Sequence, residues 1–317
     1  MTLPNQNKIC IIIAYFGKPP VTVDLWLKSC AWNPSIDFLV YADTNRADVP
    51  DNVRWVCGSL SDMRAMAEEK LRMRIKLDAP YECCDFKAVY GTIFEDYLGG
   101  YDYWGYCDMD MIFGDLASFF DRYCLYQYDR FLSWGHLSLM RNTPENNERY
   151  KLPCTDGKGY KDAFTASGST HFDEGEINSI YLAYGFPFFQ PRLCADISAL
   201  SKRMRLAGYF KDHKYQAFFW QNGKVWCAYA DRYTVSRSWV VEMKEFAYIH
   251  FQKRQMQPPA FEASETNCFY ICSDHFENKK SIAPPTLQEI QRINPYPGKI
   301  WELLEVFCYK LRNKLKE

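Results

Sequence analysis

The feature that most constrains the fold is an apolar, β-branched run near the start of the chain, Lys8 to Phe16, read KICIIIAYF. Gly17, Pro19 and Pro20 end it at once. A continuous run of this kind, without polar alternation, is typical of a parallel strand that is covered on both faces. Turns at the carboxyl ends of such strands are where α/β sheets bind ligands. The run therefore predicts an α/β protein with a site just beyond this strand.

The following segments continue an alternation of strand and helix. Residues 21–31 have helical spacing, and residues 36–41 (IDFLVY) read as a second strand that leads to Asp43. Strand, helix, strand is the usual opening of a nucleotide-binding fold. The sequence contains neither a Gly-x-Gly-x-x-Gly fingerprint nor a Walker phosphate loop. This absence disfavours dinucleotide oxidoreductases and P-loop enzymes.

A third strand-like run, residues 101–107, is rich in aromatic side chains and leads to Asp108 and Asp110. Burying unpaired carboxylates is costly, so the pair must be solvated, bonded to donors or bound to a metal. Carboxylate oxygens suit Mg²⁺ or Mn²⁺, which usually bridge a protein to substrate phosphates. The pattern indicates a cation site, with two Asp residues in an ordinary turn as the alternative.

Length and composition set further bounds. The chain has 317 residues, of which 48% are hydrophobic, enough for one large domain or a domain with an appendage. Its 38 basic and 39 acidic residues nearly cancel, so nucleic acid is not an expected partner. Aromatic residues reach 17%, which fits a carbohydrate site and equally fits an aromatic core.

Cysteine usage points to a compartment. The 13 cysteines form no paired framework, and no signal-peptide h-region precedes the first strand, so we expect free thiols in the reducing cytosol. Cys268, Cys272 and His275 have some metal-ligand spacing, but no obvious fourth ligand accompanies them, and a zinc site is not expected. No apolar run is long enough to cross a bilayer.

The remaining pattern gives the other elements. We predict helices at 61–77, 85–98, 116–123 and 177–184, a short strand at 53–56, a strand at 128–140, and late strands at 225–229, 233–239 and 246–249. The segment from Asn142 to Tyr160 is predicted to be a polar loop that closes on substrate.

Two strings carry a family resemblance: CDFKAVYG at 84–91 and DYWGYCDMDMIFGDL at 102–116. Together they resemble a family of bacterial glycosyltransferases of the GT-A fold that assemble capsule and lipopolysaccharide, and the likeness covers most of residues 8–256. The resemblance implies a GT-A-like mixed sheet flanked by helices in residues 1–257, followed by a C-terminal helical extension at 258–317. It also implies sugar transfer from a nucleotide-diphosphate donor, with a UDP-sugar expected, to a polysaccharide or lipid-linked oligosaccharide.

The resemblance also implies roles for single residues on the donor side. Nucleotide contacts would come from Ala14, Tyr15 and Asp43, and from Lys87 and Asp108. The metal, Mn²⁺ or Mg²⁺, would be held by Asp108, Asp110 and His250, the last within the motif Tyr-Ile-His-Phe-Gln-Lys. Lys253 and Arg254 would stabilise the leaving diphosphate. The ordinary alternatives are a turn cap for Asp43, a solvated Lys87 and a core His250.

On the acceptor side the resemblance implies sugar contacts from Trp134 and His136. An inverting transfer needs a carboxylate that takes the acceptor hydroxyl proton. Asp173 is the first choice for that base and Glu174 the second; without such a base, a retaining course remains open. The alternative is that these acids only stabilise the dipole of the following helix.

The last segment, Lys299 to Glu317, predicts a helix with one apolar face and a basic end. Such a helix suits peripheral contact with the cytoplasmic face of the inner membrane, or docking on its own domain. Two other function classes stay open for the whole chain: a nucleotidyl- or phosphotransferase acting on a sugar, and a non-catalytic carbohydrate-binding protein.

Overall fold

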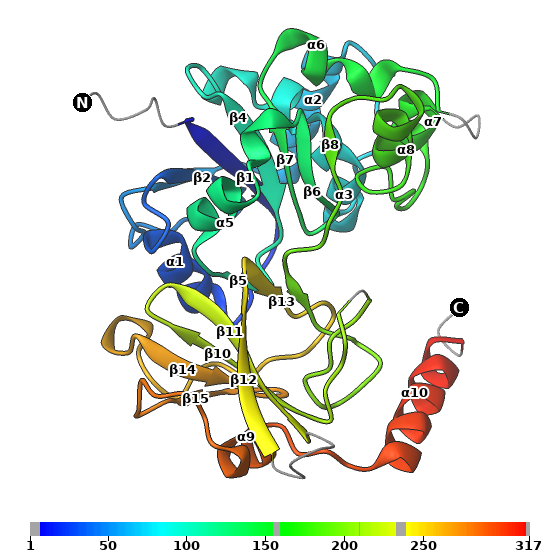
Figure 1. The fold of residues 1–317 in the computed structure, drawn as a ribbon. Helices are drawn as coiled ribbons and strands as arrows, with labels where there is room; N and C mark the ends of the chain where they lie inside the picture. Colours follow the sequence, from blue (N-terminus) through cyan, green and yellow to red (C-terminus); the bar gives the residue numbers. More distant parts are fainter. Residues whose placement is uncertain (1–6, 155–158, 209, 233–238, 315–317) are drawn as a thin grey trace. The chain divides into compact units, whose positions relative to one another are not determined.

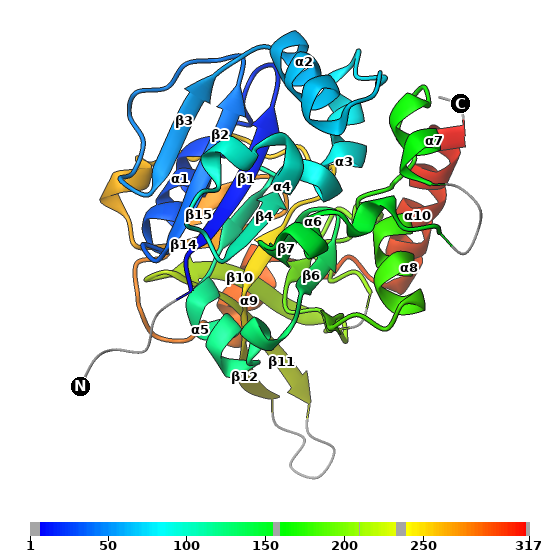
Figure 2. The same cartoon turned by 90° about the horizontal axis from the view of Figure 1, so that it is seen from above.

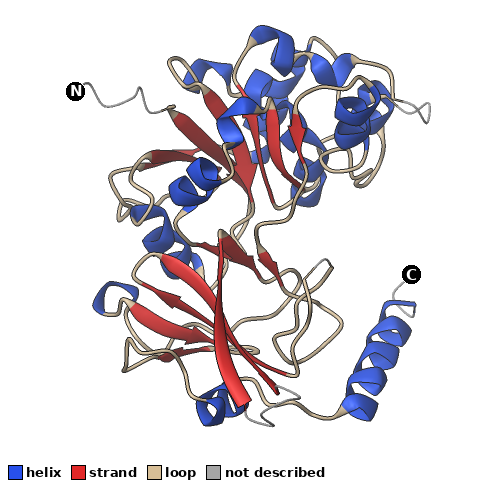
Figure 3. Ribbon diagram, viewed as in Figure 1, coloured by secondary structure: helices blue, strands red, loops and turns tan. Residues whose placement is uncertain are grey.

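The computed structural model describes residues 7–154, 159–208, 210–232 and 239–314. The chain forms two compact units that interleave in sequence (Figures 1 and 3). Unit 1 comprises residues 1–19, 33–109 and 117–192, and unit 2 comprises residues 20–32, 110–116 and 193–317. The boundary expected at 257/258 lies inside unit 2. The chain crosses between the units immediately before Asp110, within the Asp-x-Asp motif.

Unit 1 contains a seven-stranded mixed sheet in the order β3-β2-β1-β4-β7-β6-β8. The strands are β1 (Ile9–Tyr15), β2 (Ile36–Ala42), β3 (Val53–Cys57), β4 (Tyr103–Cys107), β6 (Arg130–Trp134), β7 (Leu137–Arg141) and β8 (Phe188–Phe189). β1 is parallel to both β2 and β4, and β7 is antiparallel to β4. The apolar run at the start of the chain is therefore a central, fully covered strand, as its composition predicts.

Helices cover both faces of this sheet, so the predicted mixed α/β class is confirmed. On one face Cys10, Ile12 and Trp104 pack against a group of helices seen beside the sheet in Figure 2. These are α2 (Leu60–Leu71), α3 (Cys83–Phe86), α4 (Tyr90–Ile93), α7 (Tyr160–Thr165) and α8 (Glu176–Ala183). On the other face, Phe120 of α5 (Leu116–Arg122) packs on Phe131.

Several element predictions for unit 1 need correction. Helix α2 ends at Leu71 rather than 77, because Arg72 adopts a left-handed conformation (φ 54°). The helix predicted at 85–98 is a series of short turns that runs from η1 (Pro80–Glu82) through η2 (Lys87–Val89) to η3 (Glu95–Tyr97). The strand predicted at 128–140 is the hairpin β6–β7. Part of the predicted loop at 142–160 is helical, in α6 (Pro144–Asn147) and η5 (Arg149–Lys151), and residues 155–158 lie outside the described part.

Unit 2 contains an antiparallel sheet in the order β12-β11-β10-β14-β15. Its strands are β10 (Tyr215–Gln221), β11 (Lys224–Arg232), β12 (Trp239–Phe246), β14 (Cys268–Ile271) and β15 (Phe276–Asn278). Side chains of β10 alternate between two cores: Ala217 and Phe219 face α9 (Leu287–Ile293), and Phe218 and Trp220 pack in the other. Of the strand predicted at 233–239, residues 233–238 lie outside the described part and Trp239 begins β12. Strands β10, β14 and β15 were not predicted.

The second core of unit 2 joins the large sheet to a small one, β5-β13-β9. Its strands are β5 (Met111–Phe113), β13 (Tyr248–His250) and β9 (Ala195–Asp196). Helix α1 (Val23–Ala31) packs here too, through Leu25 and through Trp26 against Phe113. The strand predicted at 246–249 is interrupted: β12 ends at Phe246 and β13 begins at Tyr248.

The described part of the chain ends with α9 and α10 (Lys299–Lys314). The extension expected to be helical, residues 258–317, also contributes β14 and β15 to the sheet of unit 2. Within the described residues, no helix is both long enough and apolar enough to cross a membrane. All 13 cysteines are free thiols.

Candidate functional site

The carboxyl ends of β1, β2 and β4 share one edge of the unit 1 sheet, because these strands are parallel and in register. Ala14 and Tyr15 end β1, and Asp43 follows β2. The Gly17 amide donates to both oxygens of the Asp43 carboxylate, at 2.9 and 3.0 Å. The loops after the first two strands are thus tied together at the edge where the sequence places the nucleotide residues.

The same edge carries a buried cation. Lys87 donates to Oδ1 of Asp108 at 2.6 Å and to the carbonyl of Gly135 at 2.8 Å. Its ammonium also lies 3.9 Å from Oδ2 of Asp173. The turn of η2 after α3 aims Lys87 inward, so it is not the solvated side chain considered from the sequence. Lys87, Asp108 and Asp173 form one ionic cluster.

The contacts within this cluster shift the pKa values of its members. Burial is the largest single influence on the Lys87 ammonium and lowers its pKa, but the acidic groups around it, Asp108 first and then Cys84 and Asp173, together outweigh burial and hold that pKa well above its usual value. Burial raises the pKa of Asp173 to about 7, with Lys87 opposing the rise and the Glu174 and Asp108 carboxylates adding to it. A carboxyl that titrates near neutrality is suited to accept and release a proton.

Gly135 brings the remaining acceptor-side residues to this cluster. It forms, with His136, the two-residue turn of the β6–β7 hairpin, and its amide donates to Glu174 at 3.0 Å. A Cβ at this position would lie 2.9 Å from an Asp173 oxygen and 3.0 Å from a Glu174 oxygen, so any larger residue would have to displace these carboxylates. The rings of Trp134 and His136 stack on either side of the turn, 6.4 Å apart.

Three residues not singled out in the sequence hold the loop that carries Asp173. The Asp85 carboxylate accepts from the amides of Thr170 and Phe172 at 2.8 and 2.9 Å. From the other side, fully buried Arg130 donates to the Asp173 carbonyl at 3.1 Å, as does the Tyr106 hydroxyl at 2.9 Å. The position of Asp173 is therefore fixed from both sides.

A second polar group lies in unit 2, at the small sheet. His250 and Asp196 are register partners on the parallel strands β13 and β9, so their side chains project from the same face. Nδ1 of His250 lies 3.0 Å from Oδ1 of Asp196, and Nε2 lies 3.4 Å from Oδ1 of Asp110. Gln252 donates to the same Asp196 oxygen at 2.9 Å. Asp110 precedes β5, which pairs with β13.

This group fits a divalent cation by its donor chemistry. A metal-bound histidine usually gives its second ring nitrogen to a carboxylate, which fixes the tautomer and the ring orientation. Asp196 occupies that role, and His250 directs Nε2 towards the Asp110 carboxylate. A carboxylate oxygen and an imidazole nitrogen together suit Mn²⁺ and, less strictly, Mg²⁺. Asp196 went unnoticed in the sequence because its strand is only two residues long.

Lys253 and Arg254 lie elsewhere on unit 2. The Arg254 guanidinium donates to backbone carbonyls of five residues, which are Ser198, Ser201, Lys202, Arg203 and Ser273. These bonds make Arg254 a clamp for the chain around residues 198–203. Lys253 is exposed on a groove of about 640 Å³.

Cys272, His275 and Glu277 also lie close enough together to share an ion. His275 is already bridged by Asp274 at 2.7 Å and Glu277 at 3.2 Å, and Arg292 pairs with Glu277. Two carboxylates therefore hold the ring of His275, one at each ring nitrogen.

Comparisons with known proteins complete the description. A family model described as "Family of unknown function (DUF6625)" matches residues 11–280. No curated protein sequence matches the chain. Among solved structures, the apo crystal structure of mouse xyloside xylosyltransferase 1 aligns with a TM-score of 0.37 and 6% sequence identity, covering 61% of this chain and 88% of the mouse chain.

Proposed function

Because this chain belongs to the family of unknown function DUF6625, no activity is inherited with the family name, and we propose that it is a metal-dependent glycosyltransferase. The donor is a nucleotide-diphosphate sugar, with UDP as the expected nucleotide. The acceptor is a polysaccharide or lipid-linked oligosaccharide of a bacterial surface polymer, and the transfer inverts the anomeric centre.

The observation that carries the proposal is the Asp110–His250–Asp196 chain of contacts. The partly exposed Asp110 carboxylate and Nε2 of His250, whose ring Asp196 orients, together form a donor set for a divalent cation. Asp110 belongs to the Asp-x-Asp motif that follows β4. By the sequence resemblance, Asp108, two residues before Asp110, would be a further ligand of the metal. When bound, Mn²⁺ or Mg²⁺ would supply positive charge for the leaving diphosphate.

The residues of unit 1 support the two remaining tasks of a transfer. The loops at the carboxyl ends of β1 and β2, with Ala14, Tyr15 and Asp43, lie where parallel sheets bind nucleotides. Asp173, whose pKa is near 7, accepts the proton of the acceptor hydroxyl while the hydroxyl oxygen bonds to the anomeric carbon. The glycosidic C–O bond to the diphosphate breaks, and the nucleotide diphosphate leaves.

The flanking residues position these groups. The Lys87 ammonium lies 2.6 Å from the Asp108 carboxylate and 3.9 Å from the Asp173 carboxylate, and it contributes a fixed positive charge beside both. Trp134 and His136, at the turn beside Glu174, offer ring faces to the acceptor sugar. Arg254 donates to backbone carbonyls and Lys253 lines the groove beside residues 299–314, so we assign neither side chain to the diphosphate.

A nucleotide and metal screen tests the proposal. The melting temperature of the full chain is measured with UDP, GDP, CMP or ADP, each with and without Mn²⁺, for wild type, Asp110→Ala and Asp121→Ala. We expect one nucleotide diphosphate, UDP, to raise the melting temperature only with Mn²⁺, since a ligand that binds the folded state stabilises it. Asp110→Ala should lose this shift. Asp121→Ala, which removes an exposed carboxylate of α5, should keep it.

Two outcomes would contradict the proposal. Stabilisation by no nucleotide at millimolar concentration would exclude a nucleotide-sugar transferase, and an equal metal-dependent shift in Asp110→Ala would exclude this metal site. Incubation with UDP-sugars then separates the reaction classes: release of UDP indicates sugar transfer, whereas incorporation of nucleotide or phosphate into product indicates a nucleotidyl- or phosphotransferase.

A further inference from the structure

Helix α10 presents an exposed apolar face. Ile300, Leu304, Phe307 and Leu311 recur at spacings of three and four, which places them along one side of a helix. Ile300 is 75% exposed and Phe307 is 64% exposed, and Trp301 and Leu303 flank them with 64% and 63% exposure. Large apolar side chains gathered on one exposed helix face mark a surface that binds something.

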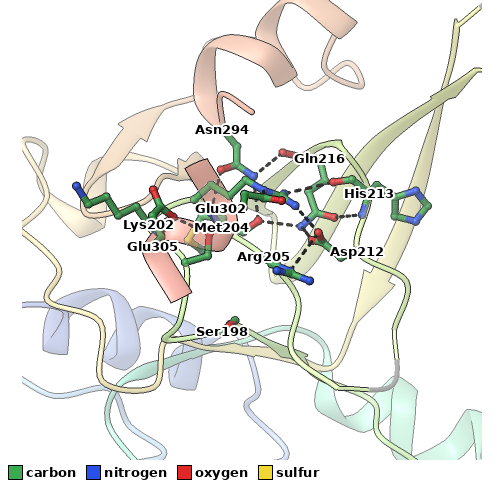
Figure 4. A network of polar contacts seen from close by, with 12 residues as sticks. Ser198, Lys202, Met204, Arg205, Asp212, His213, Gln216, Asn294, Glu302 and Glu305 are labelled. Carbon is green, nitrogen blue, oxygen red and sulfur yellow. Dashed lines mark hydrogen bonds and ion pairs between the residues drawn. The ribbon is translucent and has the colours of Figure 1, made fainter. Parts of the chain in front are cut away.

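The opposite face of α10 is fixed to unit 2 by its two acids. Glu302 pairs with the buried Arg203, and Glu305 accepts from the Lys202 amide at 2.9 Å and the Ser201 hydroxyl at 3.3 Å. Figure 4 shows Glu302, Glu305 and Lys202 within a wider polar network. In it, Asn294 bonds to Met204 and Gln216 and so fixes the chain just before α10.

The anchoring leaves a one-sided charge pattern. Since both described acids of α10 point into the network, the exposed charges on the described part of this helix are Lys299 and Lys310, which lie beside the apolar face. At about 100° per residue, Lys299 and Lys310 fall on the same flank. In the sequence, Arg312, Lys314 and Lys316 follow. A positive flank beside an apolar face is the pattern of helices that lie in anionic membrane surfaces.

The groove beside α10 continues this pattern. It has a volume of about 640 Å³ and is lined by Trp301, Leu304 and Cys308 of α10 together with Lys202 and Lys253. Neither lysine ammonium pairs with a carboxylate in the part of the chain that the structure describes, and Figure 4 shows Lys202 extending away from the network. The acids on the groove are engaged: Asp274 bonds to His275 and Glu305 to the Lys202 amide.

We propose that α10 is an interfacial anchor that docks unit 2 on an anionic lipid bilayer, with its apolar face in the headgroup region and Lys202, Lys253, Lys299 and Lys310 facing the lipid phosphates. Charge complementarity selects this occupant over a second copy of the chain, because two copies of this face would bring like charges together. The inference does not depend on the proposed sugar transfer, since it concerns binding alone.

Vesicle flotation of the full chain tests the anchor. The probes are vesicles of phosphatidylcholine alone and of phosphatidylcholine with one-third phosphatidylglycerol, at low and high salt. We expect binding only to the anionic vesicles, weakened by salt. Ile300→Glu should reduce the partition coefficient about tenfold or more, because an apolar anchor becomes charged. Ile282→Glu changes an isoleucine of the same unit that is also 75% exposed but lies outside α10, and should bind like wild type.

Two further variants define the contributions. Phe307→Glu should behave like Ile300→Glu, and Lys299→Ala with Lys310→Ala should weaken binding about tenfold at low salt and less at high salt. Absence of binding to anionic vesicles would overturn the proposal, as would equal binding by the Ile300→Glu and Ile282→Glu variants. A wild-type dimer in light scattering that Ile300→Glu dissociates, without vesicle binding, would assign the face to a second copy instead.

Discussion

Oδ1 of Asp196, on the neighbouring parallel strand, lies 3.0 Å from Nδ1 of His250 and leaves Nε2 of the ring directed towards Asp110. The arrangement follows from register, since His250 and Asp196 are partners on β13 and β9. A carboxylate at one ring nitrogen selects the tautomer whose other nitrogen carries a lone pair. The geometry therefore prepares His250 as a metal ligand whose basicity depends on a residue that would not itself touch the metal.

This relationship predicts that Asp196→Ala weakens Mn²⁺ binding by about 10- to 100-fold, as removal of an outer carboxylate partner does elsewhere. Calorimetric titration of the full chain with Mn²⁺ measures the effect. Asp274→Ala is the matched control, because Asp274 holds Nδ1 of His275 at 2.7 Å in the same unit and should not change Mn²⁺ affinity. Unchanged affinity in Asp196→Ala would remove His250 from the metal site.

Asp173 makes activity depend on pH. Its carboxyl is 4% exposed and burial raises its pKa to about 7, so only above that pH is it largely the carboxylate that a base requires. We expect the rate of sugar transfer to rise with pH through about 7, and Asp173→Asn to abolish most of the rate. Glu174→Gln should retain more activity than Asp173→Asn; the reverse order would assign the proton to Glu174.

The raised pKa of Asp173 also predicts that the free energy of unfolding falls as pH rises, which is opposite to the trend in rate. Its folded-state pKa of about 7 lies above the usual value near 4, so the folded state gives up stability as pH rises between those values. Asp173→Asn removes that cost and should stabilise the protein by up to about 4 kcal/mol at pH 8, with no gain below pH 4. Urea unfolding at the two pH values measures it. A loss of stability at pH 8 would show that the carboxylate is favourably paired.

The sequence predicted the parallel core well and the irregular parts poorly. The β-branched run of β1 and the aromatic run of β4 bury both faces, so their composition alone indicates strand. The turn between β6 and β7 was missed because Gly135 has neighbours with strand-like side chains. The segment predicted as one helix at 85–98 is largely helical, but it alternates between short α and 3-10 turns from α3 to η3.

Site residues with a sequence motif could be chosen in advance, whereas their supports could not. Asp110 and His250 have flanking motifs, and the structure brings them within 3.4 Å. Asp85, Arg130 and Asp196 act through contacts far along the chain, such as the 87-residue separation of Asp85 and Phe172. No local pattern in the sequence distinguishes such residues from ordinary polar ones.

Substitution of Gly135 should lower the transfer rate strongly and the stability only slightly. In Gly135→Ala the new Cβ would meet the ends of the Asp173 and Glu174 side chains, of which exposed Glu174 can move and buried Asp173 cannot without disturbing the cluster. We expect a loss of stability of about 1 kcal/mol and a fall in transfer rate of about tenfold or more. Gly99→Ala, where a Cβ meets nothing within 4 Å, is the control. Equal rates for the two variants would show that the hairpin turn does not position the acids.

Lys87 predicts a larger structural effect. Its ammonium is buried against Asp108 and near Asp173, so Lys87→Ala would leave two carboxylates close together without their cation. Removing one partner of a buried pair is strongly destabilising, but the Asp108 side chain is 35% exposed and can recover some hydration, so we expect a loss of about 1–3 kcal/mol.

In Lys87→Ala the pKa of Asp173 should also rise further, because the charge that lowers it is gone. The pH profile of any residual activity should therefore move to higher pH. Lys151→Ala, which removes an exposed lysine paired with Glu148, is the control and should unfold at the same urea concentration as wild type. An unshifted pH profile in Lys87→Ala would mean that the carboxyl governing the rate lies outside this cluster.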